Sequence, residues 1–171
     1  MHANGARVIF TGRSTSKAVQ IFNEVKVSYT STASELISTD KSLVFRCVDQ
    51  SDLDDVNLLI KYINNWIDIE GLEKIDYLFN NAGVFSTEFS TTKQGFETNM
   101  GINFISHMII TEALLPIIKK STDPRVIMTS SMVHKMSEIS DLNLSADKKN
   151  SHLKNYSMSK LAQIVYTKLM S

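Results

Sequence analysis

The residues best suited to chemistry in this sequence of 171 residues are a tyrosine and a lysine close to its end. They lie in the segment Asn155-Tyr156-Ser157-Met158-Ser159-Lys160, and of the 5 tyrosines only Tyr156 has a lysine four positions later. Four residues are about one helical turn, so a helix places both side chains on one face. A phenol is a poor acid at neutral pH, but a neighbouring ammonium stabilises its anion. The pair could therefore exchange a proton, although most pairs at this spacing are surface neighbours without chemistry.

Four short apolar runs precede this pair and predict the strands that must position it. The predicted strands are residues 7–11, 43–48, 75–79 and 125–129. Runs of this kind that stop at a glycine or a polar residue are typical of buried parallel strands.

Apolar residues at helical spacing predict helices between these strands. The predicted helices are residues 14–25, 51–66 and 95–119, with a closing helix from about Tyr156. Ser51 and Asp54 form a start like a capping box for the second helix. The Ser/Thr-rich stretch 28–39 gives no clear pattern.

This alternation of strands and helices predicts parallel βαβ units wound right-handedly. The expected fold class is α/β, a Rossmann-type doubly wound parallel sheet with helices on both faces, in a single domain over residues 1–171. Ligands of such sheets lie beyond the carboxyl ends of the strands. The notable residues at those ends are Gly12, Arg13, Asp49, Asn81, Ala82, Gly83 and Ser131.

The composition favours one domain with a sizeable core, because 43% of the residues are hydrophobic and 21% are charged. The 18 basic residues balance the 18 acidic ones, so no basic field indicates nucleic acid or an anionic membrane as partner, and a small molecule is expected. The single Cys47 cannot form an internal disulfide. The first residues lack a secretory apolar core, and no run reaches the roughly 18 apolar residues of a membrane span, so we expect a cytoplasmic protein.

Three motifs in this order resemble the short-chain dehydrogenase/reductase family. They are Asn80-Asn81-Ala82-Gly83 after one predicted strand, Ser130-Ser131 after the next, and Tyr156-x-x-x-Lys160 at the closing helix. The resemblance covers nearly the whole chain and is greatest to the retinol dehydrogenase branch. The stretches that carry it are Gly5-Ala6-Arg7-Val8-Ile9, Gly95-Phe96-Glu97, Gly101-Ile102-Asn103, Ser130-Ser131-Met132-Val133-His134 and Asp141-Leu142-Asn143.

The resemblance implies four catalytic roles. Tyr156 would be the acid/base, and Lys160 would stabilise its anion and anchor the ribose of the cofactor. Ser131 would orient the substrate carbonyl, and Asn103 would hold a proton-relay water. These types suit the chemistry, because hydride addition to a carbonyl leaves an alkoxide that needs a polarising hydroxyl and a proton.

The resemblance also implies a dinucleotide cofactor. Arg13, after the first predicted strand, favours NADP(H) over NAD(H), because an arginine there accommodates a 2′-phosphate. Asp49 matches the position that faces adenine, and Asn81, Ala82 and Gly83 line the cofactor at the next strand end. Tyr156 and Lys160 complete the cofactor-binding residues that the resemblance implies.

Each of these residues has a plainer alternative. Ser131 and the Asn81–Gly83 stretch could be turn residues. Asn103 could be a polar residue within a packed helix, Arg13 a surface charge, and Asp49 a cap before a helix. No metal site is expected, because His107 and His134 have no paired ligand at a suitable spacing.

The sequence departs from the family pattern at both ends. Met1–Asn4 look like the residues just before the family's second strand, so the first strand and its glycine-rich turn are missing, as are the last strands. We therefore expect an incomplete family member. Its expected function is NADP-dependent interconversion of a carbonyl and an alcohol on a lipophilic substrate such as a retinoid or steroid, with a homodimer possible. The alternative is a noncatalytic Rossmann-like fragment that acts as a binding or interaction module.

Overall fold

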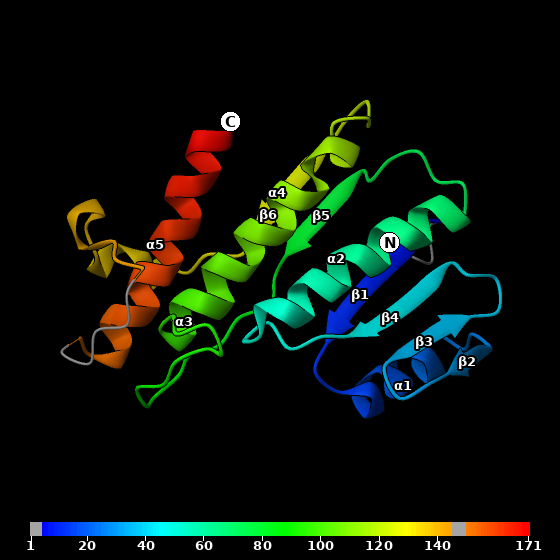
Figure 1. Cartoon of the computed structure of the whole chain (residues 1–171), viewed down its shortest axis with the longest axis horizontal. Coiled ribbons are helices and arrows are strands. Elements are labelled where there is room, and N and C mark those ends of the chain that lie inside the picture. Colours follow the sequence, from blue (N-terminus) through cyan, green and yellow to red (C-terminus); the bar gives the residue numbers. More distant parts are fainter. Residues whose placement is uncertain (1–4, 145–149) are drawn as a thin grey trace. The chain divides into compact units, whose positions relative to one another are not determined.

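The computed structural model describes residues 5–144 and 150–171, which fall into two compact units, Met1–Asp49 and Gln50–Ser171 (Figure 1). Each unit has its own sheet and its own core. The expectation about Met1–Asn4 lies outside the described residues. Whether residues 1–171 act as a single domain stays a prediction.

The first unit contains a four-stranded mixed sheet in the order β1-β4-β3-β2. Strand β1 (Val8–Gly12) pairs in parallel with β4 (Leu43–Cys47), which confirms the parallel pairing of the first two predicted strands. Strands β2 (Tyr29–Ser31) and β3 (Glu35–Ser38) form an antiparallel hairpin beside β4. This hairpin occupies the stretch for which the sequence predicted no structure.

A polar turn allows the Ser/Thr-rich hairpin to pair with β4. Ser38 is buried, but its hydroxyl donates to Asp40 Oδ1 at 2.6 Å and accepts from the Leu43 amide at 2.9 Å. Lys41 has φ 56°, in the left-handed region that few side chains adopt. The turn residues therefore satisfy a buried serine that an apolar pattern does not reveal.

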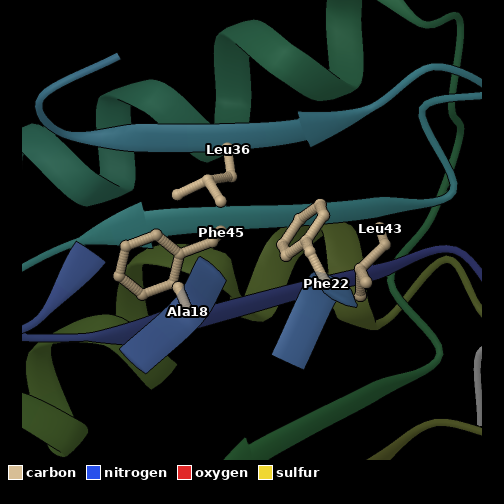
Figure 2. Close-up of a cluster of buried hydrophobic side chains, with 5 residues drawn as sticks. All are labelled: Ala18, Phe22, Leu36, Leu43 and Phe45. Carbon is tan, nitrogen blue, oxygen red and sulfur yellow. The ribbon is translucent and has the colours of Figure 1, made fainter. Parts of the chain in front are cut away.

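Helix α1 (Thr15–Glu24) covers one face of this sheet. Ser14 caps the helix by accepting from the Lys17 amide at 3.3 Å. Phe22 packs edge-on to Tyr29, and its side chain is fully buried. Figure 2 shows the core of the unit, which consists of Ala18, Phe22, Leu36, Leu43 and Phe45.

The second unit contains the parallel pair β5 (Tyr77–Asn80) and β6 (Arg125–Met128). Helix α4 (Ser106–Ile118) packs on β5, where Asn80 Nδ2 donates to Thr111 Oγ1 at 2.8 Å. The other elements are α2 (Leu53–Ile69), η3 (Met132–Met136), η4 (Ile139–Asp141) and α5 (His152–Met170). The predicted cap of α2 was wrong, because the N-cap is Asp52 and not Ser51. Asp52 Oδ1 accepts a hydrogen bond from the backbone amide of Asp54 at 2.9 Å.

The long helix predicted over residues 95–119 is divided into three parts. They are α3 (Thr98–Met100), the π-helical turn η2 (Gly101–Ile105) and α4 (Ser106–Ile118). A π-turn inserts an extra residue into the helical repeat, and such turns are frequent at functional sites. Every residue of η2 is buried.

The segment Thr98–Ile118 is long and apolar enough for a membrane span by length and composition alone, with a mean hydropathy of 1.5. The expectation that no run reaches roughly 18 apolar residues is not contradicted, because Asn103, His107 and Glu112 interrupt this segment. Moreover, 61% of the window is buried inside the protein. Asn103 and His107 are buried with it, so we interpret the segment as a core helix.

The α/β class is confirmed, but a single doubly wound parallel sheet is not what the described residues form. They form a mixed four-stranded sheet and a separate two-stranded parallel sheet. The physical reason for the mixed sheet is that the hairpin β2-β3 satisfies the open edge of β4 with antiparallel partners.

Candidate active site

Lys160 is held at the end of strand β6. The lysine is 4% exposed, and its Nζ donates to the Thr129 carbonyl at 2.9 Å. The hydroxyl of Ser130 donates in turn to the Lys160 carbonyl at 2.8 Å, so the strand end and α5 bind each other in both directions. Burial holds the pKa of Lys160 below its ordinary value.

Tyr156 lies beside this ammonium. The Nζ of Lys160 is 5.7 Å from the centroid of the Tyr156 ring, as the four-residue spacing predicts. The ring also packs edge-on to Phe85, with centroids 5.1 Å apart. Among the described residues the Tyr156 hydroxyl has no hydrogen-bond partner, although the ring is half-buried. This hydroxyl is therefore free to bond to a substrate.

Asn103 connects three elements from within the π-turn. Its Oδ1 accepts from the Val84 amide at 2.8 Å, and its Nδ2 donates to the Val84 carbonyl at 2.9 Å and to Ser159 Oγ at 3.0 Å. The side chain is completely buried. Both amide hydrogens are thus used by protein groups, so the side chain has no donor left for the proton-relay water that the resemblance implies.

Ser131 follows β6 and caps the short helix η3. Its hydroxyl accepts from the Val133 amide at 3.5 Å, and its carbonyl lies 2.7 Å from Nδ1 of His134. The η3 segment packs on α5, the helix that carries Tyr156 and Lys160. The plainer role as a turn residue therefore describes Ser131 correctly, and its half-buried hydroxyl remains a candidate for substrate contact.

The loop after β5 lies against the same group. Asn81 Oδ1 accepts from Thr129 Oγ1 at 3.0 Å, which joins the two strand ends. A Cβ added to Gly83 would lie 3.3 Å from Asn103 Oδ1 and 3.4 Å from Lys160 Nζ. Asn81, Ala82 and Gly83 are all exposed. The loop therefore passes over Lys160 with little room for a side chain at position 83.

Arg13 and Asp49 belong to the first unit. Arg13 lines a pocket of about 480 Å³ at the carboxyl end of β1, together with Gly12, Ser14 and Lys17. Asp49 is exposed and lies just after β4. The structure thus groups Arg13 with a second cation, Lys17, that the sequence analysis did not select. The available signal was its position one helical turn after the Ser14 cap.

Other residues of the site had no clear signal in the sequence. Ser159 and Gln163 on α5 are completely buried and contact Asn103, from 56 and 60 positions away. Serine and glutamine in a helix usually face solvent, so only the structure reveals them. The described residues contain no group of three potential metal-binding side chains.

The π-turn predicts a close steric constraint at Gly101. A Cβ added there would lie 2.3 Å from Thr92 Cγ2, and both residues are buried. We expect Gly101→Ala to lower the free energy of unfolding by about 1 to 3 kcal/mol, as overpacking usually does. Chemical denaturation measures this loss.

The matched control changes the group that collides. Thr92→Ser removes Cγ2 but keeps the hydroxyl that accepts from the Phe96 amide at 3.1 Å. The double variant should regain most of the stability that Gly101→Ala loses. Equal losses in the single and double variants would contradict a clash with Thr92.

The chain is similar to known proteins in both sequence and structure. The family model for short chain dehydrogenase matches residues 1–171. Among curated proteins, retinol dehydrogenase 14 of Mus musculus is 30% identical over 165 residues, and retinol dehydrogenase 12 of Homo sapiens is 31% identical over 166 residues. The alignments cover 96% and 97% of this chain and 48% of each relative. The chain thus spans about half the length of these relatives.

Solved structures show the same fold similarity. An uncharacterised protein from Mycobacterium paratuberculosis superposes with a TM-score of 0.72 at 29% identity, over 99% of this chain and 53% of that one. A short-chain dehydrogenase from Escherichia coli CFT073 complexed with NADPH has a TM-score of 0.64 at 19% identity, over 99% and 61%. At that identity the second comparison supports the fold alone.

Proposed function

This chain belongs to the short-chain dehydrogenase family, and from that membership we propose that it interconverts a carbonyl and an alcohol with NADP(H). A lipophilic substrate such as a retinoid or steroid is part of the proposal. The support for it is the similarity, at about 30% identity, to proteins named retinol dehydrogenases. The chain spans about half the length of these relatives, so that an activity of the whole protein is likewise proposed and does not follow from the similarity alone.

One observation carries the proposal: a buried ammonium, Lys160, lies beside the ring of a tyrosine whose hydroxyl has no partner among the described residues. A surface pair would show neither the burial nor the bond to Thr129. Perturbed titratable groups at strand ends are typical of functional sites.

In the proposed reaction Tyr156 moves a proton at its hydroxyl oxygen. In reduction it gives this proton to the substrate oxygen, and in oxidation it accepts the proton of the alcohol. The Lys160 ammonium stabilises the charge that develops on the phenol oxygen. This electrostatic stabilisation is stronger in a buried site than in water. Ser131 would hold the substrate oxygen by a hydrogen bond.

The residues present fit a phosphate-bearing dinucleotide. In the first unit, the pocket beside Arg13 and Lys17 offers two cations at a strand end; in the second unit, taken by itself, Gly83 places no side chain over Lys160. By the family resemblance, Arg13 would hold the 2′-phosphate, Asp49 would face the adenine, and Asn81 to Gly83 would line the cofactor. Lys160 would anchor the ribose. When bound, the nicotinamide supplies or accepts a hydride.

Cofactor choice gives a prediction for Arg13. A charge-assisted hydrogen bond to a phosphate is worth about 1.5 to 3 kcal/mol, so Arg13→Ala should weaken binding of NADPH about ten- to a hundredfold. Binding of NADH should hardly change. Titration calorimetry with adenosine 2′,5′-bisphosphate and adenosine 5′-monophosphate measures the same difference without the rest of the cofactor.

Two variants control for the loss of a positive charge as such. Lys120→Ala removes an exposed cation from the second unit and should leave both affinities unchanged. Lys17→Ala removes the second cation of the pocket and should weaken only the ligands that carry the 2′-phosphate. Equal weakening of NADPH and NADH in Arg13→Ala would show that Arg13 does not recognise the phosphate.

Turnover tests the function itself. We expect the protein to oxidise NADPH in the presence of all-trans-retinal, long-chain aldehydes or steroid ketones, faster than with short polar carbonyls. Cofactor binding without turnover of any carbonyl or alcohol would favour the noncatalytic binding module. If the protein neither bound the cofactor nor turned over any substrate, the proposal would be refuted.

A further inference from the structure

Two buried polar side chains, Gln163 on α5 and His107 on α4, meet next to the backbone carbonyl of Asn103 in the π-turn. Gln163 is 0% exposed, and its Nε2 donates to the backbone carbonyl of Asn103 at 2.7 Å. The same nitrogen lies 3.4 Å from Nδ1 of His107, which is 1% exposed. Gln163 lies near Lys160 along α5, and His107 follows Asn103 by one helical turn.

These contacts bear on where His107 carries its proton. An amide nitrogen can only donate, so a hydrogen bond between Gln163 Nε2 and His107 Nδ1 requires Nδ1 to be the acceptor and places the proton of the neutral ring on Nε2. Burial, and secondly the charge of Lys160, lower the pKa of His107 to about 4 against an opposing hydrogen bond with the backbone of Asn103, so the ring is neutral at physiological pH.

The pair is costly to the fold. Among the described residues, His107 Nε2 and Gln163 Oε1 are buried without any hydrogen-bond partner. Unpaired buried polar atoms reduce stability, and an apolar pair of similar volume would avoid this cost. A polar pair at such a place is a candidate for a role other than packing.

We propose that Gln163 is a positioning residue of the active site, which clamps the π-turn carrying Asn103 to the helix carrying Tyr156 and Lys160 and fixes His107 as the Nε2-protonated tautomer. The clamp acts on the backbone of Asn103, while the side chain of Asn103 holds Val84. Gln163 therefore controls the loop that passes over Lys160. This inference rests on the proposed function for its catalytic consequence, but the contacts can be tested without turnover.

The first test is nitrogen NMR of the imidazole in the uniformly labelled full chain. At pH 7 we expect the His107 signals of the Nε2-protonated tautomer, with no titration above about pH 5, as its low pKa requires. Gln163→Met keeps the length of the side chain but has no donor. It should give a mixture of tautomers, and the amides of Gly101–Ile105 should exchange with solvent at least tenfold faster. An Nδ1-protonated ring in the unsubstituted protein would overturn the assignment.

A second variant covers the case in which Gln163→Met does not fold. Gln163→Glu keeps the shape and places a carboxylate beside His107, so the pKa of His107 should rise by two units or more. Thr167→Val is the matched control on the same helix, because its hydroxyl donates to the Gln163 carbonyl at 2.7 Å and touches neither Asn103 nor His107 in any described hydrogen bond. It should leave the tautomer and the exchange rates unchanged.

Kinetics then separate the inference from the proposed function. In Gln163→Met we expect kcat with NADPH and a carbonyl to fall about tenfold while KM stays within twofold, because a displaced Asn103 turn affects the reacting groups more than binding. Unchanged tautomer, exchange and kcat would refute the role of Gln163. The expected NMR signals in a protein without turnover would refute the proposed function and leave the clamp standing.

Discussion

Replacing Tyr156 by phenylalanine should reduce turnover of NADPH with a carbonyl substrate about a thousandfold, within the range of 10²- to 10⁴-fold that general acid catalysis supplies. The fold should be unaffected, because the hydroxyl has no partner among the described residues and the ring contact with Phe85 is kept. Steady-state kinetics and a thermal melt of the same sample measure the two effects. KM for NADPH should change little.

A second tyrosine on the same helix provides the control. Tyr166 packs edge-on to Phe104, and its hydroxyl donates to Glu112 Oε1 at 2.7 Å. Tyr166→Phe removes the same atom from α5 and should keep turnover within a factor of about two while costing about 1 kcal/mol of stability. Equal turnover in Tyr156→Phe and the unsubstituted protein would exclude Tyr156 as the acid.

The second large effect is expected at Asn103 and concerns stability. Asn103→Ala removes three hydrogen bonds and leaves the amide and carbonyl of Val84 and the hydroxyl of Ser159 without this partner. Each such group costs about 1 to 3 kcal/mol when it is shielded from water, so we expect a loss of about 3 to 5 kcal/mol in the free energy of unfolding. Denaturant titration measures it.

A graded series distinguishes a structural Asn103 from a purely catalytic one. Ser159→Ala removes one of the three bonds and should cost about 1 kcal/mol. Suppose that the free energy of unfolding of Asn103→Ala lies within about 1 kcal/mol of that of the unsubstituted protein, but that turnover is lost. Asn103 then acts mainly in the reaction, and the hydrogen bonds in the π-turn contribute little to stability.

The positions of the main strands were predictable, because apolar runs that end in glycine or a polar residue have few alternatives. The predicted strand over residues 43–48 is β4, Leu43–Cys47, and that over 125–129 is β6, Arg125–Met128. The hairpin β2-β3 was not predictable, because the Ser38 hydroxyl is buried by bonds to a turn that hydrophobic periodicity ignores.

The start of α5 was predicted four residues too late. The true cap is Ser151, which accepts from the Lys154 amide at 3.2 Å. The first turn of α5 was not predicted, because its residues are mostly polar and show no apolar periodicity. Ser157 and Ser159 are nevertheless buried, because each hydroxyl donates to a backbone carbonyl three residues earlier.

The site was predictable only in part. The spacing of Tyr156 and Lys160 fixes their relation on a helix, so their contact follows from the sequence. The contacts of Asn103 with Gln163 and Val84 depend on how distant segments pack, and no spacing encodes them. The π-turn was not predictable either, because it changes the register of a helix without changing its composition.

The paired bonds between Asn103 and Val84 also bear on how this site can diverge. Asn103 presents one donor and one acceptor to a single residue, much as a neighbouring β-strand would, and both hydrogen bonds are made to the backbone of Val84. Any residue except proline can supply that backbone, so position 84 is free to change its side chain. Position 103 is not, because aspartate lacks the donor and glutamine is longer by one methylene. Variation of the loop can therefore reshape the rim of the site while its anchor remains fixed.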